Sequence, residues 1–150
     1  MADCITVLGA GIFGTWQALT LARAGFRVRL VEQTSAALEK SASVYAGAML
    51  APYCEAEASE PHLADLGAKG LALWQREQAG VVWNGTLVVA SHRDRSELVR
   101  FGRATTFHEQ VDRARLAALE PHLEDRFSGG LFYPREGHVV PHEALRLLRE

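Results

Sequence analysis

The sequence has few of the features that would assign it to several common classes of protein. Only two of its 150 residues are cysteines, Cys4 and Cys54, and they form no Cys-x-x-Cys pair, so neither a disulfide framework nor a zinc site is predicted. The 16 basic and 18 acidic residues give a net charge of −2, which indicates no nucleic-acid partner. No apolar run approaches the roughly 20 residues that span a bilayer, so no membrane partner is expected.

Motifs of hydrolases and metalloproteins are also missing. There is no Gly-x-Ser-x-Gly sequence and no cysteine beside a basic residue that could activate it. The six histidines lack the spacing of metal ligands, and Pro141 separates His138 from His142. The first apolar run is short and is interrupted at Gly9, so no secretion signal is predicted and a cytoplasmic location is expected. No metal site and no catalytic acid or base is predicted.

The first 32 residues have the pattern of a strand, a helix and a second strand. The apolar run at residues 4–8 predicts a short strand that is buried on both faces. Residues 12–24 contain good helix formers without proline, and Gly25 follows as a natural helix end. Residues 26–32 alternate apolar and basic side chains, as a strand does. This pattern predicts a β-α-β unit of about thirty residues.

Three glycines lie between the first strand and the helix. In a dinucleotide-binding turn, the positions of Gly9, Gly11 and Gly14 provide a tight bend, close approach of the backbone to a pyrophosphate, and close packing of the helix on the sheet. The unpaired N–H groups near Ile12 and Phe13, at the positive end of the helix dipole, would bind the phosphates.

An acidic residue ends the second strand, as the dinucleotide-binding pattern requires. Glu32 lies 18 residues after Gly14, and its carboxylate can accept hydrogen bonds from the ribose hydroxyls of an adenosine. It would repel a 2′-phosphate, so FAD or NAD is favoured over NADP. Ala18 and Ala22 continue the face of Gly14 in steps of four residues, which supports close packing of the helix.

The rest of the chain is less regular. Residues 33–52 are predicted to form a loop with a short helix, and a longer helix is predicted to begin near Pro61. The pair Asn84-Gly85 lies between two short apolar runs, which predicts a tight hairpin. Further short strands are expected before Pro141, which opens a final amphipathic helix.

Three stretches of the sequence resemble one family. Residues 9–32, SASVYAGAMLAPYCE at 41–55 and GLFYPREGHVVPHEALRLL at 130–148 resemble the FAD-dependent D-amino-acid oxidase superfamily, and within it the glycine oxidases of thiamine biosynthesis. The resemblance covers essentially the whole chain and implies FAD as the cofactor.

The resemblance also implies further cofactor contacts. Ser41 and Ser43 would lie near the pyrophosphate, and Ala48, Met49 and Leu50 would line the isoalloxazine ring. Small residues suit that place because a flat ring packed against backbone leaves little room for branched side chains. Taken without the family, the small-residue run YAGAMLA at residues 45–51 also has the less favoured interpretation of a segment that packs in a core. Many members have glycine where this chain has Ala48, so a difference in the local turn is expected.

The implied fold is an α/β chain that is a part of a longer enzyme. Residues 1–80 would form a Rossmann-type FAD-binding segment, residues 81–140 part of a β-rich substrate domain, and residues 141–150 the start of a helix that returns to the FAD domain. Family members are more than twice as long, so the chain is expected to be truncated before the residues that grip the substrate.

The implied activity is oxidation of the C–N bond of a small amine or amino acid such as glycine. Hydride would pass to the flavin, and an imine and hydrogen peroxide would result, with molecular oxygen as the acceptor. Two alternatives stay open: a flavin-dependent amino-acid dehydrogenase with another electron acceptor, and a truncated remnant that binds FAD without catalysis. A homo-oligomer is compatible with the sequence.

Overall fold

A computed structural model describes residues 4–123 and 125–150 and divides them into two compact units. Unit 1 takes in the chain up to Ala48 together with Trp74–Val81 and Val139–Glu150. Unit 2 consists of Met49–Leu73 and Val82–His138, so the stretch between residues 49 and 73 groups with the later strands. In the described part of the chain, no helix combines the length and the apolar character that crossing a membrane requires.

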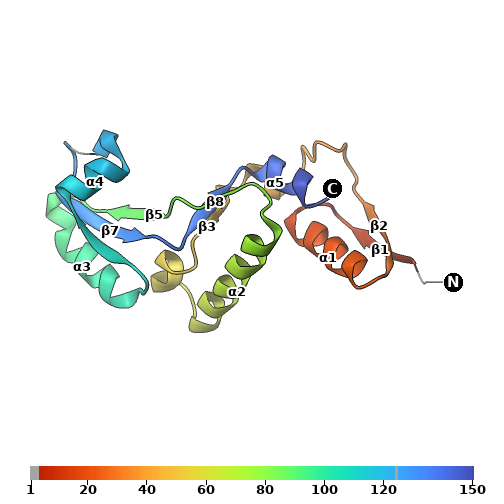
Figure 1. Ribbon diagram of the computed structural model, residues 1–150, viewed down its shortest axis with the longest axis horizontal. Helices are drawn as coiled ribbons and strands as arrows, with labels where there is room; N and C mark the ends of the chain where they lie inside the picture. Colours follow the sequence, from red (N-terminus) through yellow and green to blue (C-terminus); the bar gives the residue numbers. More distant parts are fainter. Residues whose placement is uncertain (1–3, 124) are drawn as a thin grey trace. The chain divides into compact units, whose positions relative to one another are not determined.

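The elements are helices and short strands in mixed order (Figure 1). In chain order they are β1 Cys4–Leu8, α1 Ile12–Arg23, β2 Arg27–Val31, η1 Ala42–Tyr45, β3 Met49–Leu50, η2 Cys54–Ala58, α2 Pro61–Glu77, β4 Val81–Val82, β5 Thr86–Val89, η3 His92–Asp94, α3 Arg95–Ala104, β6 Glu109–Asp112, α4 Arg113–Leu119, η4 Pro121–Leu123, β7 Gly129–Tyr133, β8 Gly137–Val139 and α5 Pro141–Leu147, where η marks a 3-10 helix.

Unit 1 contains the predicted β-α-β unit. Strands β1 and β2 pair in parallel, from Cys4 opposite Arg27 to Leu8 opposite Val31, and α1 connects them. After α1, Gly25 takes a φ of +88°, a left-handed conformation that costs glycine little and ends the helix. The pattern read from the first 32 residues is therefore confirmed (Figure 1).

The core of unit 1 joins segments that are distant in sequence. Ala10, Leu38 and Leu145 are buried together, so α5 packs beside the glycine-rich turn and the loop after β2. On another side of α1, the rings of Trp16 and Trp74 meet edge to face with their centroids 5.3 Å apart, a favoured arrangement of aromatic rings.

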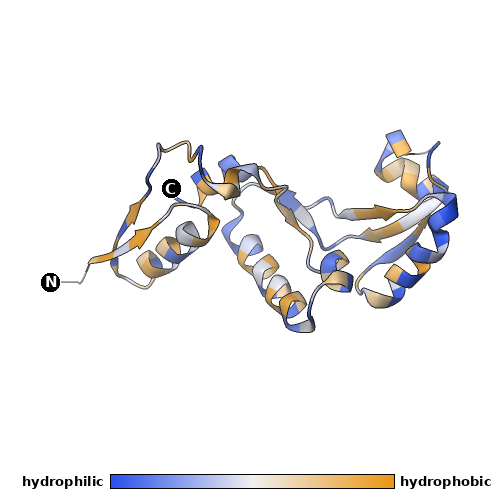
Figure 2. Cartoon of the chain, turned by 180° about the vertical axis from the view of Figure 1, so that it is seen from behind, coloured by the Kyte–Doolittle hydropathy of each residue, from blue (hydrophilic) through white to orange (hydrophobic). Residues whose placement is uncertain are grey.

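The prediction that the first strand is buried on both faces is wrong for the described residues. Cys4, Thr6 and Leu8 are exposed, and the side chain of Leu8 is 79% exposed. The reason is that β1 and β2 form a sheet of two strands, with α1 as their main packing partner. The apolar character of both strands is visible in Figure 2.

Unit 2 is built on an antiparallel sheet with the strand order β5-β7-β6. Its core is formed by Ala51, Cys54, Leu131 and Tyr133, against which Leu98 and Phe101 of α3 pack. The fully buried hydroxyl of Tyr133 lies 2.7 Å from that of Thr105, which in turn donates to the carbonyl of Phe101 at 2.9 Å. The buried hydroxyls of Tyr133 and Thr105 are thus paired with each other.

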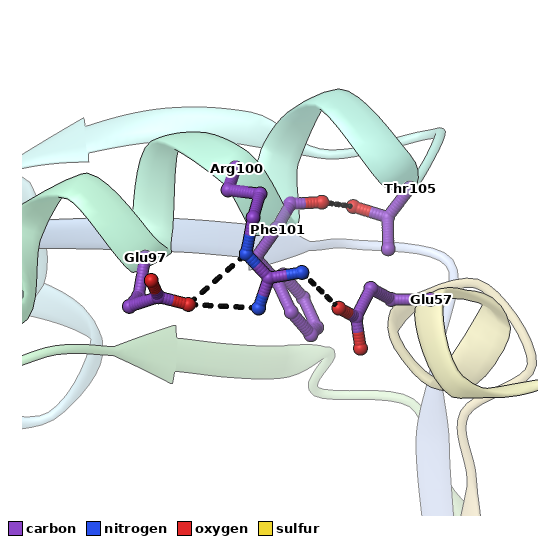
Figure 3. A network of polar contacts seen from close by, with 5 residues as sticks. All are labelled: Glu57, Glu97, Arg100, Phe101 and Thr105. Carbon is purple, nitrogen blue, oxygen red and sulfur yellow. Dashed lines mark hydrogen bonds and ion pairs between the residues drawn. The ribbon is translucent and has the colours of Figure 1, made fainter.

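An ion-pair network connects η2 with α3. The guanidinium of Arg100 contacts the carboxylates of Glu97 and Glu57, each at 2.7 Å (Figure 3). Glu57 comes from η2, whereas Glu97 lies one turn before Arg100 on the same helix. Because the arginine is largely exposed, we expect this network to contribute little to stability.

The predicted hairpin at Asn84-Gly85 does not form. Strand β4 belongs to the sheet ordered β3-β8-β4, whereas β5 pairs with β7. Gly85 has a φ of +81°, and an added Cβ would lie 2.4 Å from the ring of Phe132. The glycine therefore allows a tight change of direction between two sheets rather than a turn back onto the same strand.

Candidate functional site

The glycine-rich turn between β1 and α1 is held by two close approaches. Gly9 has a φ of +93°, and its N–H donates to the carbonyl of Val31 at 2.7 Å, which ties the turn to the end of β2. An added Cβ at Gly14 would lie 1.9 Å from the carbonyl oxygen of Gly9. The helix can therefore start this close to the strand only because Gly14 has no side chain.

Ser41 and Ser43 lie against the same turn. A Cβ on Gly11 would be 3.1 Å from each of their hydroxyl oxygens. The hydroxyl of Ser43 accepts the N–H of Ile12 at 3.0 Å, while the N–H of Phe13 has no hydrogen-bond partner among the described residues. The fold thus brings the two serines and the first turn of α1 together, although they are about thirty positions apart in sequence.

Glu32 reaches back from the end of β2 to the turn. Its Oε2 atom accepts the N–H of Ala10 at 2.9 Å, and its Oε1 atom accepts the N–H groups of Gln33 and Thr34 at 2.8 and 3.2 Å. These bonds, that from Ala10 above all, hold the pKa of the Glu32 carboxyl below its usual value. Oε2 accepts one bond and keeps a second lone pair for another donor.

Thr15 is a residue of this turn that the sequence did not single out. Its side chain is buried, and its hydroxyl donates to the carbonyl of Ala10 at 2.9 Å. Ala10 is therefore held at its N–H by Glu32 and at its carbonyl by Thr15. A hydroxyl directly after Gly14 was the available signal, but threonine inside a helix has many possible partners.

Replacing Thr15 by valine should loosen the turn with little change in shape. The variant removes the donor to Ala10 and leaves its buried carbonyl unpaired, which costs about 1–3 kcal/mol. We expect a lower melting temperature for Thr15→Val and recovery for Thr15→Ser, which restores a hydroxyl. Thermal unfolding followed by circular dichroism measures both, and equal melting temperatures for valine and wild type would contradict the assigned hydrogen bond.

The small-residue run after η1 divides between the two units. In unit 1, the carbonyl of Ala48 accepts the N–H of Val139 at 3.1 Å. In unit 2, Met49 and Leu50 form β3 and pair with His138 and Gly137 of β8. Ala48 has a φ of +51°, so the backbone takes a conformation that favours glycine although the residue is alanine.

Ala48→Gly should stabilise the protein. A left-handed alanine costs about 1–2 kcal/mol, and glycine removes this strain while it adds freedom to the unfolded chain. We expect a net gain of up to about 1 kcal/mol in the free energy of unfolding, measured by urea denaturation. Gly47→Ala is the neighbouring control without a left-handed φ, and a loss of stability in Ala48→Gly would show that the strain is offset elsewhere.

A family model for FAD-dependent oxidoreductases, the DAO model, matches residues 4–150. The chain belongs to the DAO family. The resemblance read from residues 9–32, 41–55 and 130–148 is therefore confirmed, and FAD is the cofactor of this family.

Relatives of this DAO-family chain include named oxidases. A Rhizobium etli protein named as thiamine biosynthesis oxidoreductase ThiO is 44% identical over 145 residues, which cover 96% of this chain and 44% of the relative. Two solved glycine oxidases share the fold with a TM-score of 0.77 and 22% identity. That from Bacillus cereus is matched over 99% of this chain and 43% of its own length, and that from Geobacillus kaustophilus over 97% and 42%. The chain thus spans less than half the length of each relative.

Proposed function

We propose that this chain supplies the adenosine- and pyrophosphate-binding part of a cytoplasmic flavoprotein oxidase that acts on a small amine or amino acid such as glycine. The observation that carries the proposal is the turn from Gly9 to Gly14 with Glu32 fixed beside it. The ThiO and glycine oxidase names of its relatives support the substrate class and a place in thiamine biosynthesis.

The residues of the turn fit such a cofactor. Because Gly11 has no side chain, the hydroxyls of Ser41 and Ser43 lie close to the backbone of the turn, where a pyrophosphate would bind. The N–H of Phe13, which has no partner among the described residues, lies at the positive end of α1. Ser43 accepts from Ile12 and keeps its own hydroxyl hydrogen for an anion. Glu32 has one acceptor position on Oε2 for a ribose hydroxyl.

We assign Ser41, Ser43, Ala48, Met49 and Leu50 to the cofactor as the resemblance implies. When bound, FAD supplies an acceptor for the hydride that leaves the carbon bearing the amine. The described residues contribute binding and orientation, and none of them is assigned as a catalytic acid or base. Oxidation of the amine would give an imine, and reoxidation of the cofactor by molecular oxygen would give hydrogen peroxide.

Flavin content and peroxide release test the proposal together. We expect the complete reading frame, purified from its host, to show flavin absorbance and to consume oxygen with glycine while it releases peroxide. Reduction of a dye without peroxide would favour an amino-acid dehydrogenase. A protein without flavin absorbance would contradict the proposal and favour a non-catalytic remnant.

A further inference from the structure

Glu136 is a buried carboxylate that the glycine-rich turn does not use. The residue is 0% exposed, and it lies between β7 and β8. Its Oε1 atom accepts the N–H groups of Tyr53 and Cys54, at 2.7 and 2.8 Å. Its Oε2 atom is buried and has no hydrogen-bond partner in the described part of the chain. A half-paired buried carboxylate is costly, so its presence calls for a role.

The backbone of Glu136 connects two further segments of unit 2. Its N–H donates to the carbonyl of Tyr133 at 3.3 Å, and its carbonyl accepts the N–H of Gly85 at 3.0 Å. The residue therefore links the turn after β7, the start of β5 and the chain at residues 53 and 54. A change in its side chain leaves the backbone bonds available and acts mainly on residues 53 and 54.

The chain between Met49 and Cys54, called here the 49–54 segment, is held at both ends by β8 and the turn before it. At its start, Met49 and Leu50 pair with β8 in antiparallel register. At its end, the carboxylate directly before β8 accepts both N–H groups. If the carboxylate could not reach them, two donors would lose their acceptor, and each donor that stays buried would be left unpaired.

We propose that Glu136 is the positioning residue of the 49–54 segment and fixes Met49 and Leu50 where they line the flavin. The inference rests on the proposed function, because the resemblance assigns those two residues to the ring. The role of Glu136 requires an acceptor oxygen within hydrogen-bond distance of the N–H groups of Tyr53 and Cys54. The negative charge is dispensable, since Oε2 pairs with nothing among the described residues.

Two variants separate the effect of side-chain length from the effect of charge. Glu136→Gln keeps an oxygen at the same reach and removes the charge, whereas Glu136→Asp keeps the charge and shortens the side chain by one methylene. Cys54 reports on the segment itself, because its thiol is buried and its pKa is raised to about 12 by burial and by the nearby carboxylate. Cys4, which is exposed, serves as an internal control for labelling.

The experiment uses the complete reading frame, with brief iodoacetamide labelling read by mass spectrometry at Cys4 and Cys54. We expect Cys54 to be labelled about tenfold faster in Glu136→Asp than in wild type at every pH, because local opening exposes the thiol. In Glu136→Gln we expect only the faster labelling that follows from a lower thiol pKa once the carboxylate charge is gone, which the pH dependence of labelling separates from opening. We also expect the Kd for FAD to rise about tenfold and the visible flavin spectrum to shift in Glu136→Asp alone.

Three results would overturn the inference. The first is wild-type labelling of Cys54 in Glu136→Asp. The second is a Glu136→Gln variant as impaired as Glu136→Asp, which would make charge the requirement. The third is fast labelling of Cys54 in Glu136→Asp with wild-type FAD affinity and spectrum. That result would show that Glu136 holds the 49–54 segment without affecting the flavin. A wild-type protein without FAD would instead refute the proposed function. The labelling of Cys54 would still show whether Glu136 holds the 49–54 segment.

Discussion

Gly14→Ala should weaken FAD binding strongly and destabilise the protein. The added Cβ would lie 1.9 Å from the carbonyl oxygen of Gly9, a distance that only movement of the backbone can relieve. Overpacking of this kind typically costs about 1–3 kcal/mol, and here the clash is with backbone, so α1 must move away from the turn and carry its N–H groups with it. We expect at least a hundredfold weaker affinity for FAD, together with a lower midpoint of urea unfolding.

A second glycine-to-alanine change provides the matched control. Gly70 lies inside α2, and a Cβ there would have nothing within 4 Å. Gly70→Ala should therefore stabilise the protein by about 0.5–1 kcal/mol through the higher helix propensity of alanine. If Gly14→Ala retained flavin and stability as Gly70→Ala does, the close contact between α1 and the turn would be refuted.

Glu32→Ala should weaken FAD binding by about tenfold to a hundredfold, since it removes the proposed ribose acceptor and leaves the N–H of Ala10 unpaired. Fluorescence titration of the apoprotein with FAD measures the change. Glu32→Gln keeps one acceptor oxygen and should lose less. Glu39→Ala is the control, because the carboxylate of Glu39 accepts a bond from the hydroxyl of Ser35 and does not contact the turn. Equal retention of FAD by Glu32→Ala and Glu39→Ala would contradict the assignment.

The pH dependence of binding follows from the same carboxylate. The pKa of Glu32 is lower in the folded protein than in the unfolded chain, chiefly because of the bond from Ala10. Its stabilising contribution is therefore complete above the unfolded pKa and is lost as pH falls through the lowered folded pKa. We expect FAD release on acidification to include a step below the usual range of glutamate, and this step should be absent in Glu32→Gln.

Sequence reasoning succeeded where the determining interactions are local. The spacing of Gly9, Gly11 and Gly14 and the alternation in β2 specify a parallel β-α-β unit almost alone. Pro141 marked the start of α5 for a similar reason, because proline fits the first turn of a helix. The backbone conformation of these elements depends on residues within a few positions.

The wrong or missing predictions concern features that depend on contacts between residues far apart in the sequence. Asn84-Gly85 has the local chemistry of a hairpin, but pairing of β5 with β7 directs the chain into another sheet. The side chain of Glu136 accepts hydrogen bonds from backbone N–H groups 83 and 82 positions away in the sequence, and no periodic pattern predicts such a contact. The exposure of β1 likewise depends on which elements pack against it. The apolar residues of the strand itself do not predict those elements.

The burial of Cys54 has a consequence for the resistance of its thiol to oxidation. Peroxide oxidises thiolates rather than thiols, and a thiol with a pKa of about 12 is ionised in only about one molecule in 100,000 at neutral pH. The core of unit 2 thus keeps its cysteine almost entirely in the protonated form that resists sulfenic acid formation.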